Sequence, residues 1–374
     1  MSIRILHTAD NHIGMKFSSY SPATRDRLIN ERLDSLKQIV DVGNTQLVNY
    51  LVIAGDLFDT TTVKVSDITK TAGILKEFKG DAVIIIPGNH DFFESATESL
   101  WSRFKKVADD QKVFLLSAQE VFEHEIGEQK VNFFPAPCHS KHSEVNMIGW
   151  VKDHPKDPTA LNIGIAHGNV TGLGLDDADK YFNMTTTELK ATNLDLWLLG
   201  HIHVPYPLTQ KINQNPGFFM SGFHTPDGWK RNRGGGCWMI EADENKNIKA
   251  ELLPTGTLRF YDWEKTINSE VELTQLQQEI NQLNASNSLV RLTVNGRLSA
   301  EVHASLSGMS QQWSAALLEF YYQDQVKLNI DEQYINTHYS TGSLPHSLLT
   351  ELSHEDSDGL ELQLANDLIE KIKL

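Results

Sequence analysis

The chain has 374 residues, of which 40% are hydrophobic and 22% charged, the composition of an ordinary globular protein. With 33 basic and 49 acidic residues, its formal net charge of −16 excludes a surface that is basic throughout, although a local basic groove remains compatible. The length suits one large domain followed by a smaller one.

The two cysteines, Cys138 and Cys237, form neither a CxxC pair nor a disulfide framework. The opening residues MSIRILHTAD lack the basic and apolar segments of a signal peptide, and no run of about 18 apolar residues occurs. We therefore expect a cytoplasmic protein that makes no use of a membrane.

Short apolar runs alternate with helical patterns in the first half of the chain. Several runs lack polar alternation, which is typical of strands covered on both faces. Between the first two, Leu28, Leu33, Leu36 and Ile39 keep helical spacing over residues 21–44, so we expect an α/β core. The predicted strands are Ile3–Thr8, Tyr50–Ala54, Ala82–Ile86, Val113–Leu116, Val131–Phe134, Asn162–Ala166 and Leu194–Leu199.

The pattern changes after His203. A glycine-rich stretch at 221–236 leads into a predicted hairpin at 237–253, which we expect to end the core domain. We place the domain boundary near 265, giving domains 1–265 and 266–374. In the second domain we predict a helix at Leu273–Leu283, a strand at Leu289–Val294, a helix around Trp313–Tyr322, a strand near Val326–Ile330 and a terminal helix.

Polar residues that bind metals follow the predicted strands. One run, DAVIIIPGNHD, stops at a proline before Asn, His and Asp. Residues two apart in an extended chain point to the same side, and open α/β sheets bind ligands at the carboxyl ends of their strands. The candidates are Asp10 and His12 in TADNHIG, Asp56 and Asp59 in AGDLFD, Asn89, His90 and Asp91 in PGNHD, His167, and His201 and His203 in GHIH.

Each of these motifs alone is more simply explained by a capping Asp or a hydrogen-bonded core His. The ordered set is harder to explain in that way, because five of the fifteen histidines stand at strand ends beside Asp and Asn. Carboxylate, imidazole and amide ligands together suit manganese, iron or zinc better than an all-oxygen magnesium site. The set therefore predicts a metal centre.

The order DxH, GDxFD, GNHD, H, GHxH resembles that of calcineurin-like metallophosphoesterases. Over residues 1–265 the fuller text, HTADNHIG, RLDSLKQIV, VIAGDLFD and IIIPGNHD, resembles SbcD-type DNA-repair nucleases and their YhaO-like relatives. The resemblance implies a four-layer αββα sandwich, in which two mixed sheets pack between helices, with a smaller α/β capping domain after it.

The resemblance also implies two divalent metal ions, manganese first, with iron, zinc or magnesium as alternatives. Such a pair clamps a phosphodiester for in-line displacement, so we expect direct attack by hydroxide without a Ser or Cys nucleophile. One ion would be held by Asp10, His12, Asp56 and His203, and the other by Asp56, Asn89, His167 and His201.

Two further residues of the PGNHD motif are expected to be catalytic. His90 would support the phosphoryl oxygens or protonate the leaving oxygen, and Asp91 would orient it. A turn-stabilising role for Asp91 is the alternative. Asp59 is expected to hydrogen-bond its loop without binding metal.

The resemblance favours DNA as substrate, cleaved by exonuclease or endonuclease action in repair and recombination. Lys230, Arg231 and Arg233 stand beside flexible glycines and are candidate phosphate contacts, with a solvated surface as the alternative. The loop from Ser221 departs from the usual nuclease text. Two other functions stay open: a phosphatase or phosphodiesterase acting on small nucleotides, and a non-catalytic DNA-end-binding scaffold.

A partner is implied because SbcD-type nucleases work with a separate SMC-like coiled-coil ATPase of the SbcC type. The chain contains no Gly-Lys dipeptide and hence no Walker A loop of its own. Leu360, Leu364, Leu368 and Ile372 recur every four residues and could dock on that partner, or instead pack on their own domain. A homodimer formed through the nuclease domain is also compatible with the resemblance.

Overall fold

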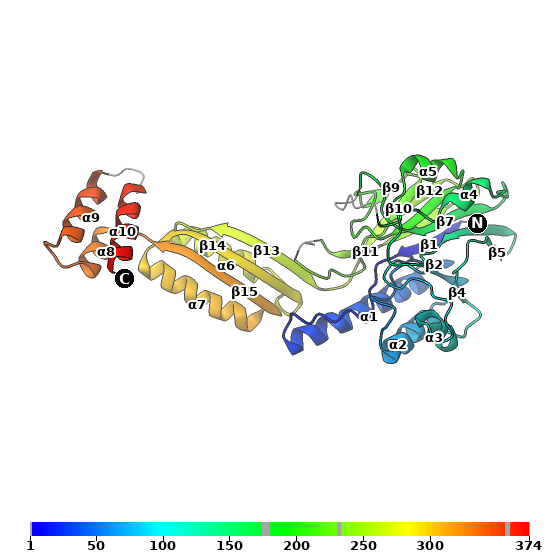
Figure 1. Cartoon of the computed structure of the whole chain (residues 1–374), viewed down its shortest axis with the longest axis horizontal. Coiled ribbons are helices and arrows are strands. Elements are labelled where there is room, and N and C mark those ends of the chain that lie inside the picture. Colours follow the sequence, from blue (N-terminus) through cyan, green and yellow to red (C-terminus); the bar gives the residue numbers. More distant parts are fainter. Residues whose placement is uncertain (1, 174–179, 230–232, 356–359, 374) are drawn as a thin grey trace. The chain divides into compact units, whose positions relative to one another are not determined.

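The structure, a computed structural model, describes residues 2–173, 180–229, 233–355 and 360–373 (Figure 1). The chain divides into two compact units, Met1–Arg259 and Phe260–Leu374. Among the described residues, no helix combines the length and apolar character needed to cross a membrane.

The first unit contains a mixed seven-stranded sheet in the order β4-β3-β2-β1-β11-β12-β9. Strands β1 to β4 are parallel, and β11 pairs antiparallel with both β1 and β12, which confirms the predicted hairpin. The strands are β1 (Ile3–Thr8), β2 (Tyr50–Ala54), β3 (Ala82–Ile86), β4 (Val113–Leu115), β9 (Lys211–Ile212), β11 (Gly235–Ala242) and β12 (Ile248–Thr255).

A second mixed sheet has the order β10-β8-β7-β6-β5. Its strands are parallel except for β5, which forms an antiparallel hairpin with β6. The strands are β5 (Phe122–Ile126), β6 (Gln129–Ala136), β7 (Leu161–His167), β8 (Leu196–Gly200) and β10 (Phe218–Met220).

The two sheets pack face to face, and helices cover both outer faces, so the predicted αββα sandwich is confirmed (Figure 1). Along β2, Val52 and Ala54 enter the core between the sheets, while Leu51 and Ile53 enter the core beneath the helices. Burial on both sides explains why these strands show no polar alternation. The helices are α1 (Pro22–Thr45), α2 (Val65–Lys76) and α3 (Leu100–Val107) on the first sheet, and α4 (Gly149–Asp153) and α5 (Thr186–Ala191) on the second.

The second unit begins a few residues before the boundary expected at 265, because β13 (Arg259–Thr266) belongs to its sheet. That sheet has the order β13-β14-β15, and its core is shared with two helices. These elements are β14 (Ser288–Leu298), β15 (Glu319–Leu328), α6 (Glu270–Asn281), α7 (Ala300–Ala316) and the 3-10 turn Ala285–Asn287.

The helix predicted around Trp313–Tyr322 is wrong in its second half. Helix α7 ends at Ala316, and β15 runs parallel to β14 from Glu319 onward. Phe320 and Tyr322 pack on the core, whereas Tyr321 between them is 39% exposed. This period of two is the pattern of a strand, which the aromatic residues obscured at the level of sequence.

Three helices end the described chain: α8 (Glu332–His338), α9 (Leu344–Glu355) and α10 (Leu360–Lys373). They share a small core of Ile335, Tyr339, Leu349 and Leu362. One terminal helix was predicted, and α8 and α9 were missed.

Candidate metal centre

The predicted donors gather where strands of the two sheets end. Asp10 and His12 follow β1, Asp56 follows β2, and Asn89 and His90 follow β3. From the second sheet, His167 is the last residue of β7, and His201 and His203 follow β8. The carboxyl ends of five strands therefore supply one site, as expected for ligand binding in parallel sheets.

Two glycines allow these strand ends to approach one another. A Cβ atom on Gly55 would lie 2.2 Å from Nδ1 of His167, and one on Gly200 would lie 2.1 Å from the carbonyl oxygen of Ala54. Gly55 also has a φ of +88°, which L side chains rarely adopt. A side chain at either position would push the two sheets apart at the site.

Four of the donors have left-handed backbone conformations. The φ angles are +53° at Asp10, +44° at His12, +52° at Asp56 and +94° at His201. Asp and His tolerate this region better than most residues, and such strain gathers at functional sites. The pairs Asp10 with His12 and His201 with His203 do reach one site, but through tight turns and without the extended backbone expected from their spacing.

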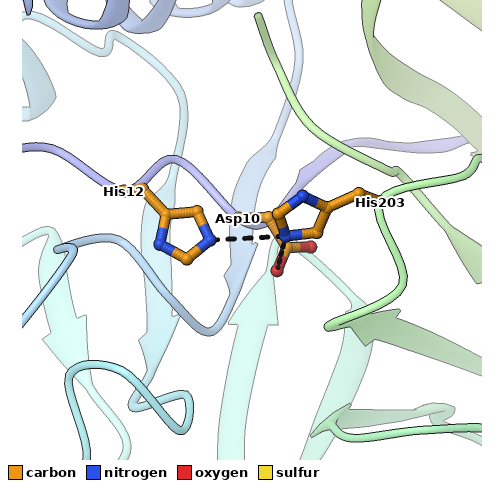
Figure 2. A group of neighbouring side chains, drawn as sticks. All are labelled: Asp10, His12 and His203. Atoms are coloured by element: carbon orange, nitrogen blue, oxygen red, sulfur yellow. Dashed lines mark hydrogen bonds and ion pairs between the residues drawn. The ribbon is translucent and has the colours of Figure 1, made fainter. Parts of the chain in front are cut away.

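The first cluster is formed by Asp10, His12 and His203 (Figure 2). Nε2 of His203 lies 3.4 Å from Oδ1 of Asp10 and 3.4 Å from Nε2 of His12. Asp56 borders this cluster, with its Oδ2 atom 3.8 Å from Nε2 of His12.

The second cluster contains Asp56, Asn89, His167 and His201. Nε2 of His167 lies 3.2 Å from Oδ2 of Asp56 and 3.0 Å from Oδ1 of Asn89. The same amide oxygen is 3.1 Å from Nδ1 of His201. All seven predicted donors are therefore brought together, and one Asp56 oxygen faces both clusters.

His90 also faces this site. Its backbone N–H donates to Oδ1 of Asp56 at 2.8 Å, and its ring lies edge-on to His12 with centroids 4.7 Å apart. Nδ1 of His90 lies 3.0 Å from the backbone carbonyl oxygen of Asp59. That carbonyl orients the His90 ring.

Asp91 does not take the orienting position predicted for it. Its two carboxylate oxygens accept hydrogen bonds from the backbone N–H groups of Gly88 at 2.7 Å and Phe58 at 3.0 Å. Its own carbonyl accepts from the indole of Trp101. The turn after β3 directs this side chain inward, so it ties two loops together, which was the alternative considered for it.

Residues 3–205 match the family profile described as calcineurin-like phosphoesterase. The chain belongs to this family. Members of the family bind two divalent metal ions, and the clusters described above supply candidate ligands for them.

Three relatives resemble this phosphoesterase at low identity. The uncharacterized metallophosphoesterase YhaO of Bacillus subtilis is 22% identical over 214 residues, 54% of this chain and 48% of YhaO. The SbcD component of nuclease SbcCD from Staphylococcus saprophyticus is 24% identical over 280 residues, 69% of this chain and 70% of the relative. DNA double-strand break repair protein Mre11 of Saccharolobus solfataricus is 32% identical over 91 residues, 24% and 23% of the two chains. The match thus spans about half the length of YhaO.

The electrostatics of the phosphoesterase site favour added positive charge. Burial alone would lower the pKa of His167, but the facing carboxylate of Asp56 raises it to about 9. Burial would raise the pKa of Asp56, yet His167 holds it below its ordinary range. Burial, followed by the charge of His167, lowers the pKa of His201 to about 4. A buried carboxylate beside crowded histidines is a setting that a cation stabilises.

The donor set fits divalent first-row metals. Asp10, Asp56 and Asn89 offer buried oxygen atoms, and the histidines offer ring nitrogens within the same two clusters. The carboxylates exceed the single buried guanidinium nearby, that of Arg32, so the site has an excess of negative charge that dications would neutralise.

Two residues near the site were missed by sequence reasoning. Asp227 lies 3.6 Å from Nδ1 of His203, and the fully buried Arg32 lies 3.7 Å from Asp227. Asp227 stands in a Pro-Asp-Gly sequence that indicates an ordinary turn, and Arg32 fits the polar face of a helix. Of the predicted substrate contacts, Arg233 is exposed, and Lys230 and Arg231 lie outside the described residues.

Replacement of Asp91 should destabilise the protein more than it impairs chemistry. Asp91→Ala would leave two buried N–H groups without their acceptor, at about 1–3 kcal/mol each. We expect the free energy of unfolding in urea to fall by roughly 2–5 kcal/mol. The exposed residue Asp41 gives the control, since Asp41→Ala should change stability by less than about 0.5 kcal/mol. Unchanged stability with lost activity would instead make Asp91 catalytic.

Proposed function

We propose that this phosphoesterase is a two-metal DNA nuclease of the SbcD type, acting in DNA repair and end processing. The observation that carries the proposal is the convergence of seven metal-competent donors, with one Asp56 oxygen facing both clusters. The likeness to a protein named as part of a nuclease and to a protein named for double-strand break repair favours DNA over other phosphoesters.

In this proposal the first metal position lies between Asp10, His12, Asp56 and His203, and the second between Asp56, Asn89, His167 and His201. Manganese is the proposed ion, because mixed nitrogen and oxygen donors suit it better than they suit magnesium. When bound, two such ions would neutralise the phosphate and activate a water molecule for in-line attack.

His90 is the proposed catalytic residue. Because its Nδ1 faces the carbonyl oxygen of Asp59, that nitrogen carries a proton, and Nε2 is the atom available to exchange a proton with substrate. Its backbone N–H is fixed by Asp56, so the ring is held at the edge of the metal positions. It would protonate the leaving oxygen or support the phosphoryl oxygens.

The unit from Phe260 onward is proposed to be a capping domain, and Arg233, with Lys230 and Arg231, is proposed to contact the DNA backbone. A cytoplasmic location is proposed with it, and the two cysteines, which are buried and unpaired, suit a reducing compartment.

Helix α10 is proposed to dock on the coiled-coil helices of an SMC-like ATPase. Its other face, with Leu362, packs in the small core of α8, α9 and α10. The predicted docking residues point away from that core, with exposed fractions of 68% for Leu360, 60% for Leu364, 50% for Leu368 and 84% for Ile372.

An apolar groove of about 260 Å³ continues this surface onto α9, where Leu344 and Leu348 are 80% and 40% exposed. Such a stripe at helical spacing is the pattern by which amphipathic helices bind apolar partners. A coiled-coil partner presents a matching row of apolar positions.

The nuclease proposal predicts manganese-dependent cleavage of end-labelled linear duplex or single-stranded DNA. Asp56→Ala should reduce cleavage by more than about 100-fold, beyond the 10–100-fold typical for residues that only support a ligand. The control is Asp41→Ala, an exposed carboxylate on α1. Bis-p-nitrophenyl phosphate is assayed in parallel. Hydrolysis of that diester with DNA untouched, even with the ATPase present, would favour a small-phosphoester enzyme.

The catalytic role of His90 predicts a separation of metal binding from turnover. His90→Asn should bind Mn²⁺ within about twofold of wild type while turnover of DNA falls by about 10²–10⁴-fold, the usual contribution of a general acid. Calorimetric titration measures the first quantity, and the DNA assay the second. Wild-type turnover in the variant would remove His90 from the mechanism.

The docking proposal predicts that charges on α10 release the partner. Leu364→Glu with Leu368→Glu should weaken binding of the ATPase by about 100-fold or more, since two leucines lose about 1.5–3 kcal/mol of burial each. Both side chains are exposed, so the helix should remain folded. Glu361→Gln on the same helix is the control. Undiminished co-purification of the double variant would contradict the proposal.

A further inference from the structure

The two histidines of the first metal position are each backed by a carboxylate. His12 and His203 direct their Nε2 atoms toward each other, 3.4 Å apart, at the centre of the cluster. Their Nδ1 atoms face outward instead. Nδ1 of His12 lies 3.5 Å from Oδ1 of Asp59, and Nδ1 of His203 lies 3.6 Å from Oδ2 of Asp227.

These Nδ1 atoms are buried, and within the described parts of the chain neither has a partner at hydrogen-bonding distance. The carboxylates at 3.5 and 3.6 Å are in ion-pair range, so a small side-chain rotation would complete each hydrogen bond. A cation at Nε2 strengthens Nδ1–H as a donor, which favours that closure.

Arg32 holds Asp227 in place. Its side chain is 1% exposed, with Nη2 3.7 Å from Oδ2 of Asp227. Nη1 donates to the carbonyl oxygen of Asn11, the residue between Asp10 and His12, at 2.7 Å. The same positive charge faces Asp59.

The loop that carries Asp227 is anchored to the same helix. A ring nitrogen of His224, Nε2, lies 2.9 Å from the carbonyl oxygen of Arg32. This loop belongs to the stretch whose text departs from that of the nucleases. Its departure thus falls on residues that line the metal centre.

The second metal position lacks comparable support among the residues that the structure describes. Nδ1 of His167 faces the carbonyl oxygen of Ala54 at 2.8 Å, a neutral acceptor. Nδ1 of His201 faces the amide oxygen of Asn89 within the cluster itself. Carboxylate support is therefore confined to the first position.

We propose that Asp59 and Asp227 are positioning residues that set the affinity of the first metal position, and that Arg32 fixes Asp227 for this role. The inference rests on the metal positions of the proposed function. A carboxylate at Nδ1 fixes the tautomer that presents Nε2 and makes that nitrogen a stronger donor, a contribution of about 10–100-fold in metal affinity.

The test is a calorimetric titration of Mn²⁺ into protein that has been dialysed against a chelator. Wild type should bind two ions. In Asp227→Asn one of the two affinities should fall by about 10–100-fold while the other stays within about twofold. Asp59→Asn should weaken the same step, Asp227→Glu should restore part of the loss, and Asp41→Asn should match wild type.

Two unchanged affinities in Asp227→Asn and Asp59→Asn would overturn the proposal, as would an equal fall in both affinities. Circular dichroism checks the fold of each variant, and if Asp227→Asn fails to fold, Asp59→Asn decides. The titration contains no DNA, so it is separate from the nuclease assay. Two bound ions without DNA cleavage would contradict only the nuclease function, whereas fewer than two would overturn the metal positions.

Discussion

The buried carboxylate of Asp56 is the constraint on which the site depends. It is 1% exposed, at the junction of two apolar sheets, where an isolated negative charge would cost several kcal/mol. The fold answers by bringing polar partners to it from other strand ends: the backbone N–H of His90 at 2.8 Å and the ring of His167 at 3.2 Å. The close approach of the sheets at Gly55 and Gly200 follows from this requirement.

The αββα core could be predicted from sequence because strands buried on both faces are continuous apolar runs, and because each run stops at the residues that matter. Asp10, Asp56 and His167 were found for that reason. The second unit was harder, since the aromatic residues around Phe320 serve a strand as well as a helix. Asp227 could not be found, because its role depends on a loop folding back against His203 and Arg32.

Much of this site is unfavourable for folding alone. Left-handed backbone at Asp10, His12, Asp56 and His201 costs about 1–3 kcal/mol each, and Arg32 is buried with its charge. A core of apolar residues in the same place would be more stable. The surrounding sheets hold these conformations, which is the usual relation between a rigid α/β scaffold and strained loops that do the chemistry.

The tight contact at Gly55 and Gly200 also restricts how this protein evolves. Substitution at either position drives a side chain into His167 or into the opposite strand, so no gradual route through larger residues exists. Surface positions such as Asp41 are free to drift. Lineages that diverge in substrate and partner should therefore keep these two glycines while their loops and second domains change, and ancestry is recorded at the sheet junction more durably than function is.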